Sequence, residues 1–136
     1  MWAKLTIRTS TKTELVDITT QVQEIVQKSF VRDGICYLFI PHTTAGLTLN
    51  ENWDPSVRED IIRTLNKLVP QAGDYRHVEG NSPAHIKASL MGFSATIPIR
   101  NSHLLLGTWQ GIYLAEFDGP RQRNVWVHVA PLNQSP

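Results

Sequence analysis

The sequence is poor in cysteine, in net charge and in long apolar runs. Its 136 residues contain one cysteine, Cys36, which excludes an internal disulfide and a metal site built from four thiolates. The formal net charge of +1 gives no electrostatic reason to expect nucleic acid or a membrane surface as a partner. The chain has neither an apolar run of membrane-spanning length nor a signal-peptide core at its start. We therefore expect a cytoplasmic protein with no nucleic-acid and no membrane partner.

The sequence does have the composition of a folded domain. Hydrophobic residues make up 41% of it and charged residues 18%, as in ordinary globular proteins. A chain of this length can bury a core of its own, so residues 1–136 are expected to form a single domain. Cys36 lies between Ile35 and Tyr37 in an apolar run, which favours a buried strand residue over a nucleophile.

Hydrophobic periodicity predicts both strands and helices. Helical spacing occurs at residues 20–32, at 55–68 after Asp54-Pro55, and at 83–91 after an N-cap at Ser82. The strands expected from alternating or apolar runs are residues 3–10, 14–18, 35–40, 45–50, 93–99, 103–107, 111–118 and 122–130. This order predicts an α+β domain: a β-rich, mostly antiparallel sheet or sandwich with three helices.

Some features of the sequence also predict how these elements pack. Thr11-Lys12-Thr13 and Asp118-Gly119-Pro120-Arg121 are typical of turns, so each is expected to join its two flanking strands in a hairpin. The continuous apolar run at 35–40 predicts a strand that is covered on both faces. Helix 55–68 is expected to bury a stripe that consists of Val57, Ile61, Leu65 and Leu68.

Three histidines stand in polar turns and are candidate metal ligands. His77 and His85 flank one turn, and His85 falls in the first turn of the helix near Pro83. The positive end of the helix dipole favours a neutral imidazole there, which is the form that binds metals. His42 lies in another compact stretch, residues 41–46. If the three converge, they suit zinc with an open position for water; otherwise each caps a backbone group or lies at the surface.

His103 and His128 lie inside strand patterns without a polar cluster, and we expect neither to be a ligand. Glu51 ends the strand that follows His42, where it could hydrogen-bond a ligand ring, orient a bound water, or simply close a loop. Trp109 and Gln110 lie between two glycines and could present a flat face and an amide to a small molecule. The alternative is a bulge or hairpin with Trp109 in the core.

Four charged residues flank the turn near the end of the chain. Glu116 and Asp118 share one face of a strand, and Arg121 and Arg123 share one face of the next. Across a hairpin they form opposite-charge pairs that contribute little at a surface. In a cleft, the arginines could instead bind a phosphate while the carboxylates hold them in place. Carboxylates beside arginines have low pKa values and make poor acids, so we favour anion binding or a structural role.

Together, these motifs resemble the YjbQ-like family through nearly the whole chain, in order. The resemblance rests on His42-Thr43-Thr44-Ala45-Gly46-Leu47 with Asn50-Glu51, on His77 with Gly80-Asn81 and Ala84-His85, on Leu106-Gly107-Thr108-Trp109-Gln110, and on Glu116-Phe117-Asp118-Gly119-Pro120-Arg121-Gln122-Arg123. It implies a β-rich α+β protein that assembles as a homotrimer. It also implies a metal-binding cluster of His42, His77 and His85, and the weak activity behind the family label "secondary thiamine-phosphate synthase enzyme".

Three functions remain open from the sequence. The first is a transferase that joins a pyrimidine methyl diphosphate to a thiazole phosphate, with Asn81, Trp109, Gln110, Arg121 and Arg123 as ligand-binding residues. The second is a metal-dependent hydrolase of unknown substrate, in which His42 and His85 belong to the catalytic group and Glu51 is the base. The third is a non-catalytic trimer that binds a metal or a ligand. Histidine ligands favour zinc over the magnesium that usually assists diphosphate departure, which favours the second over the first.

Overall fold

The structure is a computed structural model that describes residues 1–132. Its elements, in chain order, are β1 (Trp2–Arg8), β2 (Glu14–Asp17), α1 (Thr19–Lys28), β3 (Gly34–Phe39), β4 (Ala45–Glu51), α2 (Pro55–Leu68), α3 (Ser82–Met91), β5 (Ser94–Arg100), β6 (His103–Leu104), β7 (Gln110–Glu116) and β8 (Gln122–Pro131). Within these residues, three helices accompany two antiparallel sheets, which confirms the predicted α+β class. No helix in this described part is long and apolar enough to cross a membrane.

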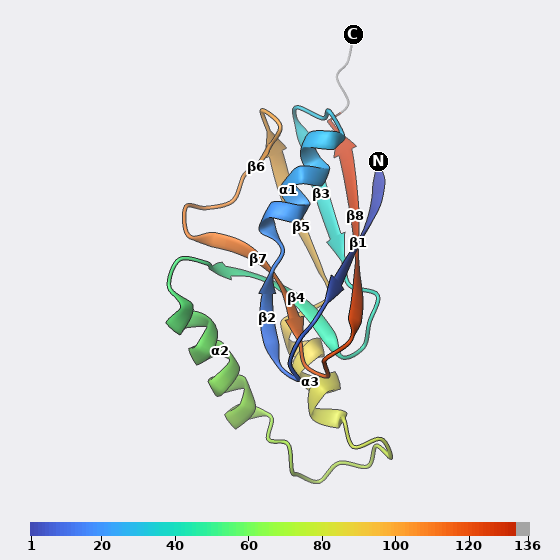
Figure 1. Ribbon diagram of the computed structural model, residues 1–136, viewed down its shortest axis with the longest axis vertical. Helices are drawn as coiled ribbons and strands as arrows, with labels where there is room; N and C mark the ends of the chain where they lie inside the picture. Colours follow the sequence, from blue (N-terminus) through green and yellow to red (C-terminus); the bar gives the residue numbers. More distant parts are fainter. Residues whose placement is uncertain (133–136) are drawn as a thin grey trace.

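The strands divide between a five-stranded and a three-stranded sheet. The larger sheet has the order β1-β8-β3-β5-β6 and the smaller has the order β2-β7-β4. Every neighbouring pair of strands is antiparallel. Figure 1 shows α1 beside the upper part of the larger sheet, α2 standing at one side of the molecule, and α3 at its lower end.

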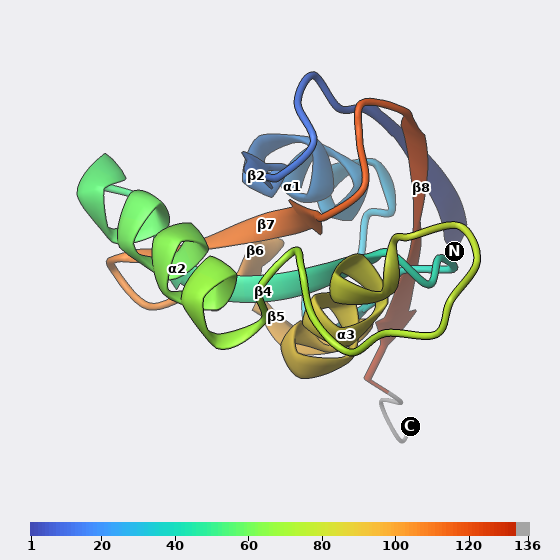
Figure 2. The same cartoon turned by 90° about the horizontal axis from the view of Figure 1, so that it is seen from below.

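The main core lies between the two sheets and α1. Leu38 and Val127 of the larger sheet belong to one cluster with Leu114 of β7 and Val22 of α1. A second cluster covers the opposite face of the smaller sheet, where buried residues of β7 and α3 meet half-buried residues of α2. Seen from below, α3 and the connector that precedes it close one end of the molecule (Figure 2).

Both predicted hairpins are wrong. β1 pairs with β8 and β2 pairs with β7, so residues 9–13 cross from one sheet to the other, and the turn after β7 crosses back. The two crossings pack together, because the Gly119 N–H donates to the Lys12 carbonyl at 3.0 Å. A Cβ on Gly119 would lie 2.4 Å from the Thr11 carbonyl oxygen. Alternation in a sequence predicts a strand but does not name its partner.

The larger sheet leaves its outer face uncovered, contrary to the prediction for residues 35–40. Cys36 is fully buried, as predicted, but Tyr37 and Phe39 are about half-exposed on the other face of β3. Trp126 is the register partner of Phe39, and Trp2 and Tyr37 both pair with His128. We call the exposed side chains of Trp2, Tyr37, Phe39 and Trp126 the outer aromatic face.

Two other elements differ from the prediction in packing or length. The apolar stripe of α2 is only half-buried at Val57, Ile61 and Leu65, and Leu68 is exposed. The strand expected at 103–107 is reduced to the two residues of β6, because the chain then leaves the sheet on its way to β7. The stripe predicted the helix correctly, but a helix at the edge of a small domain has little core left to cover it.

Candidate functional site

A buried ion pair closes the lower end of the main core. Glu116 ends β7 and Arg123 lies near the start of β8, each on the inward face of its strand. Arg123 donates from Nε to Glu116 Oε1 at 2.9 Å and from Nη2 to Oε2 at 2.5 Å. The two side chains are 2% and 0% exposed. The predicted charge pairing is confirmed, but the pair lies between the sheets and not at the surface.

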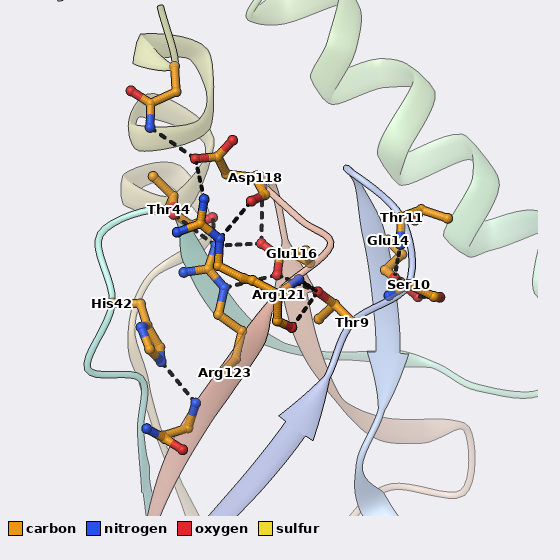
Figure 3. Close-up of polar contacts among 12 residues, drawn as sticks. Thr9, Ser10, Thr11, Glu14, His42, Thr44, Glu116, Asp118, Arg121 and Arg123 are labelled. Carbon is orange, nitrogen blue, oxygen red and sulfur yellow. Dashed lines mark hydrogen bonds and ion pairs between the residues drawn. The ribbon is translucent and has the colours of Figure 1, made fainter. Parts of the chain in front are cut away.

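Neighbouring polar groups satisfy the rest of this pair (Figure 3). Thr9 Oγ1 and the Asp118 N–H donate to Glu116 at 2.8 Å and 3.0 Å. Arg123 Nη2 also donates to Thr44 Oγ1 at 2.8 Å. Burial alone would raise the pKa of Glu116, but the hydrogen bonds from Arg123, Asp118 and Thr9 outweigh it and lower that pKa. Arg123, predicted to bind a ligand, is therefore buried and held by the protein itself.

Asp118 connects Arg121 to the start of α3. Arg121 donates from Nη2 to Asp118 Oδ2 at 3.0 Å and from Nε to the Asp118 carbonyl at 2.8 Å. Asn81 Nδ2 donates to the same Oδ2 at 2.9 Å. Asn81 is the N-cap residue of α3, where the sequence predicted Ser82, and its side chain makes no capping bond. Among the described residues, its Oδ1 is buried and has no hydrogen-bond partner.

His77 and His85 lie together, as the sequence predicted. Their ring centroids are 5.2 Å apart and their planes are nearly perpendicular, at 89°. His85 is in the first turn of α3, and His77 belongs to the connector, where its Nε2 is 3.9 Å from Glu79 Oε2. The turn at Gly80, with a φ of +74°, lets the connector fold back over α3.

His42 is bonded differently. Its Nε2 accepts the backbone N–H of Asn124 at 2.9 Å, so the ring proton is carried by Nδ1. Burial lowers the pKa of His42, and the nearby charges of Arg123 and Arg121 lower it further, against the opposing charge of Glu116. His42 is therefore a neutral imidazole close to the buried ion pair.

The histidines fit a metal ion in part. Two imidazoles that share a tetrahedral zinc ion, each through a nitrogen about 2 Å from the metal, have centroids about 5 Å apart. His77 and His85 have this spacing. His42 does not fit as it stands, because the nitrogen that would bind the metal is occupied by Asn124. Residues 1–132 contain no group of three His, Cys, Asp or Glu side chains that could hold a metal, so the three-histidine site stays a prediction.

The other predicted site residues lie at the far end of the smaller sheet. Glu51 is the register partner of Gln110, whereas the start of β4 pairs with Glu116. Six residue steps along a strand separate these ends by roughly 20 Å. Glu51 accepts the Trp53 N–H, and Gln110 accepts the Gly107 N–H. Trp109 is exposed and packs edge-to-face on Trp53, so within one chain these residues do not join the histidines.

Sequence reasoning missed Thr9 as part of this constellation. Thr9 follows Leu5 and Ile7 at the two-residue spacing of an inward-facing strand surface, so it marks a polar group at the end of the core. That spacing was a usable signal. The buried position of Glu116 and Arg123 was not visible, because it depends on the two strands lying in different sheets.

Known proteins that resemble this chain share both its sequence and its fold. The family model described as "UPF0047 protein YjbQ-like" matches residues 3–131. The UPF0047 protein MJ1081 of Methanocaldococcus jannaschii is 53% identical over 129 residues, which cover 95% of this chain and 94% of that protein. An uncharacterised YjbQ/UPF0047 protein of Clostridium acetobutylicum has a crystal structure that is 55% identical, with a TM-score of 0.92 and coverage of 94% and 99%. A protein of unknown function from Sulfolobus solfataricus is 35% identical, with a TM-score of 0.92 and 96% coverage of each chain.

Proposed function

The chain belongs to the UPF0047 YjbQ-like family, and we propose that it is an enzyme that acts on a small phosphorylated molecule with a divalent metal ion, zinc most readily. The observation that supports this best is the pair of imidazoles at His77 and His85, spaced as two ligands of one tetrahedral ion. Asn81 and Asp118 link the start of the same helix to Arg121, a guanidinium that is half-exposed at the same end of the molecule. The proposed cation site and the proposed phosphate-binding group therefore lie near one another.

His77, His85 and the Oδ1 of Asn81 are the proposed ligands. Asn81 and His85 are four residues apart at the start of α3, and side chains with this spacing lie on one face of a helix. The Oδ1 atom is buried without a partner, which a coordinated cation would supply. His42 would be a further ligand only if it released the Asn124 N–H. A bound ion would supply a Lewis acid for a phosphoryl oxygen.

The remaining residues have proposed roles that follow from their hydrogen bonds. Arg121 uses Nε and one Nη2 proton on Asp118, and the rest of its five N–H donors can bind the oxygens of a phosphate. His42 is neutral with its proton on Nδ1, so it can donate a hydrogen bond to a substrate oxygen. The buried Glu116 fixes Arg123 beside His42, and the charge of Arg123 favours the neutral ring although the charge of Glu116 opposes this.

Thiamine-phosphate synthesis is the specific reaction to test first. Its substrates carry a diphosphate and a phosphate, and both need cationic groups of the kind proposed here. Arg121→Ala should lower kcat/KM by raising KM for the phosphorylated substrate. Arg63→Ala, on the exposed surface of α2, should leave KM unchanged. A hydrolase remains the second candidate, because two imidazoles suit zinc. Glu51 is not available as its base within one chain, since it lies at the far end of the smaller sheet.

Metal content decides the metal part of the proposal. Protein purified without a histidine tag should contain near-stoichiometric zinc or a similar ion by elemental mass spectrometry, and His77→Ala and His85→Ala should lose it. His103→Ala serves as the control, because that ring is bonded to the Asn101 carbonyl elsewhere in the structure. Retention in His42→Ala favours Asn81 as the third ligand, and loss favours the three-histidine set. Wild type that stays metal-free after incubation with divalent ions would refute the metal site.

We also propose that copies of the chain assemble, as a homotrimer, through the outer aromatic face. Four large aromatic side chains lie exposed on one side of the sheet, and three of them line an apolar hollow. Contiguous exposed apolar surface of this kind is typical of interaction sites. Sedimentation equilibrium should give the mass of a trimer for wild type and of a smaller species for Trp126→Glu. A monomer mass for wild type would contradict this assembly.

A further inference from the structure

A buried lysine on α3 has no counter-charge among residues 1–132. Lys87 is only 6% exposed, and its Nζ donates to the Asn66 Oδ1 at 2.5 Å. An ammonium group has three N–H donors, and this is the single hydrogen bond it makes among the described residues. No carboxylate of residues 1–132 forms an ion pair with it. A buried charge is unfavourable unless it is paired, so Lys87 lacks a partner that a ligand can provide.

The lysine lines a partly enclosed cavity of about 300 Å³. The cavity lies between residues 9–13, which cross from one sheet to the other, the end of α2, the connector from α2 to α3, and α3 itself. Its polar lining consists of Lys12, Thr13, Asn66, Gln71 and Lys87. Ala84 and Phe117 form the apolar part of the wall. This volume is at the lower end of the range for small-molecule sites, and none of the residues that line it is acidic.

The lining gives the cavity two positive charges and several neutral hydrogen-bonding groups. The backbone of Lys12 is held in place because its carbonyl accepts the Gly119 N–H at 3.0 Å. Burial lowers the pKa of Lys87, and the charge of Lys12, which lines the same cavity, lowers it further. Two cations that repel each other across a cavity without an acid are stabilised by an anion between them.

We propose that this cavity binds a small dianion, either inorganic phosphate or the phosphate group of a monoester, between Lys87 and Lys12. A phosphate monoester carries a charge of about −1.5 to −2 at neutral pH, which matches two ammonium groups better than a carboxylate does. Thr13, Asn66 and Gln71 can donate hydrogen bonds to its oxygens. The space beside Ala84 and Phe117 accommodates a small organic group attached to the phosphate.

This site is separate from the histidine-rich end and does not depend on the proposed function. Lys87 and His85 are two residues apart on α3, and side chains with this spacing point to opposite sides of a helix. The cavity lining includes none of His42, His77, His85 or Arg121. Loss of metal binding at the histidines would therefore leave phosphate binding at Lys87 unchanged.

The test is a titration of the ¹⁵N-labelled full chain with sodium phosphate, followed by two-dimensional NMR, with sodium chloride added to keep the ionic strength constant. The backbone amides of Thr13 and Lys87 should shift and saturate. Lys87→Met and Lys12→Met should each weaken the affinity by at least about tenfold, since a hydrogen bond to a charged group is worth more than that. Lys12 is exposed, so its substitution leaves the fold intact even if Lys87→Met does not.

Lys67→Met is the matched control, because Lys67 lies in the exposed last turn of α2 and is not part of the cavity lining. It should bind phosphate like wild type. Sodium acetate at the same ionic strength should cause a smaller, non-saturating shift. The proposal is wrong if the wild type shows no saturable shift with phosphate, or if acetate binds to it as tightly as phosphate does. It is also wrong if Lys12→Met binds phosphate like the wild type, or if Lys67→Met loses the response. A shift confined to the amides near Arg121 would also overturn it, because it would place the phosphate at the other site.

Discussion

Arg123 and Glu116 form a two-pronged ion pair between the two sheets, with Nε–Oε1 and Nη2–Oε2 distances of 2.9 Å and 2.5 Å. The pair joins the last residue of β7 in the smaller sheet to β8 in the larger one. It also orders the segments around it, because Thr9, Thr44 and the Asp118 N–H all bond to it. The same few atoms therefore hold the sheets together and position the groups near His42.

Glu116→Gln should destabilise the protein strongly. It leaves the Arg123 guanidinium buried without its counter-charge, and removing one member of a buried pair costs about 3–5 kcal/mol. The free energy of unfolding from urea titration measures this loss. Glu24→Gln, at an exposed position on α1, should change stability by no more than about 0.5 kcal/mol. An equal effect of the two substitutions would contradict the buried pair.

Replacing both members of the pair should cost less than the two single changes added together. In Glu116→Leu with Arg123→Met, no buried charge is left alone, and apolar side chains of similar size fill the space. A double-mutant cycle on the free energies of unfolding should give a coupling of about 1–3 kcal/mol. Additive effects would mean that the two side chains do not interact as the structure shows.

Stability should fall in acid partly through Glu116. Hydrogen bonds, chiefly from Arg123, lower its folded-state pKa below the ordinary value of 4.5 in spite of burial. The unfolded chain therefore takes up the proton more readily, so the contribution is complete above about pH 4.5 and is lost as the pH falls through the folded-state pKa. Urea titrations from pH 7 to acid should show the difference between wild type and Glu116→Gln narrowing below pH 4.5. A constant difference would contradict the lowered pKa.

The sequence predicts what is local and fails where a partner must be chosen. Periodicity placed the helices and the strands correctly except at 103–107, and Asp54 accepts the Ser56 N–H as a predicted helix cap should. It could not show that β1 and β2 lie in different sheets, because an alternating strand can pair with any suitable edge. The same error placed Glu116 and Arg123 on the two strands of one hairpin.

The candidate site was predictable to a similar extent. The turn at Gly80 and the start of α3 were enough to bring His77 and His85 together. The position of His42 relative to them depends on how β8 passes behind it, since its ring bonds to Asn124. The burial of Lys87 also has a signal in the sequence, because it is the one Lys, Arg, Asp or Glu in the apolar and small-residue helix from Ser82 to Met91.

Cys36 should be unreactive in the native protein. It is fully buried in β3, and burial raises the pKa of its thiol to about 11, so the reactive thiolate is scarce at neutral pH. A thiol-specific chromogenic reagent at pH 8 should label it only as fast as the protein unfolds, and at once in urea. Rapid labelling without denaturant would show that β3 opens locally.

His42 should titrate below its ordinary value of 6.5. Burial lowers its pKa first, and Arg123 and Arg121 add to the effect. Because protonation is easier in the unfolded chain, His42 stabilises the fold above pH 6.5, and this contribution is lost as the pH falls through the lower folded-state pKa. Long-range ¹H–¹⁵N NMR should show the neutral ring with its proton on Nδ1 at pH 7. Arg121→Gln should raise the His42 pKa, and a wild-type value at or above 6.5 would contradict the structure.

Gly46→Ala should disturb both stability and the histidine pair. A Cβ at Gly46 would lie 2.7 Å from the Gly92 carbonyl oxygen and 3.1 Å from the Met91 Cβ, so β4 and the end of α3 would have to separate. The same Gly92 carbonyl accepts the Leu47 N–H, which would be strained as well. Overpacking of this kind costs about 1–3 kcal/mol, and a displaced α3 carries His85 with it. Urea unfolding and the NMR signals of the His77 and His85 rings report the two effects.

Gly107→Ala is the control, since a Cβ there meets only the end of the flexible Gln110 side chain, at 3.3 Å. If Gly46→Ala behaved like Gly107→Ala, the contact between β4 and α3 would not be what positions His85.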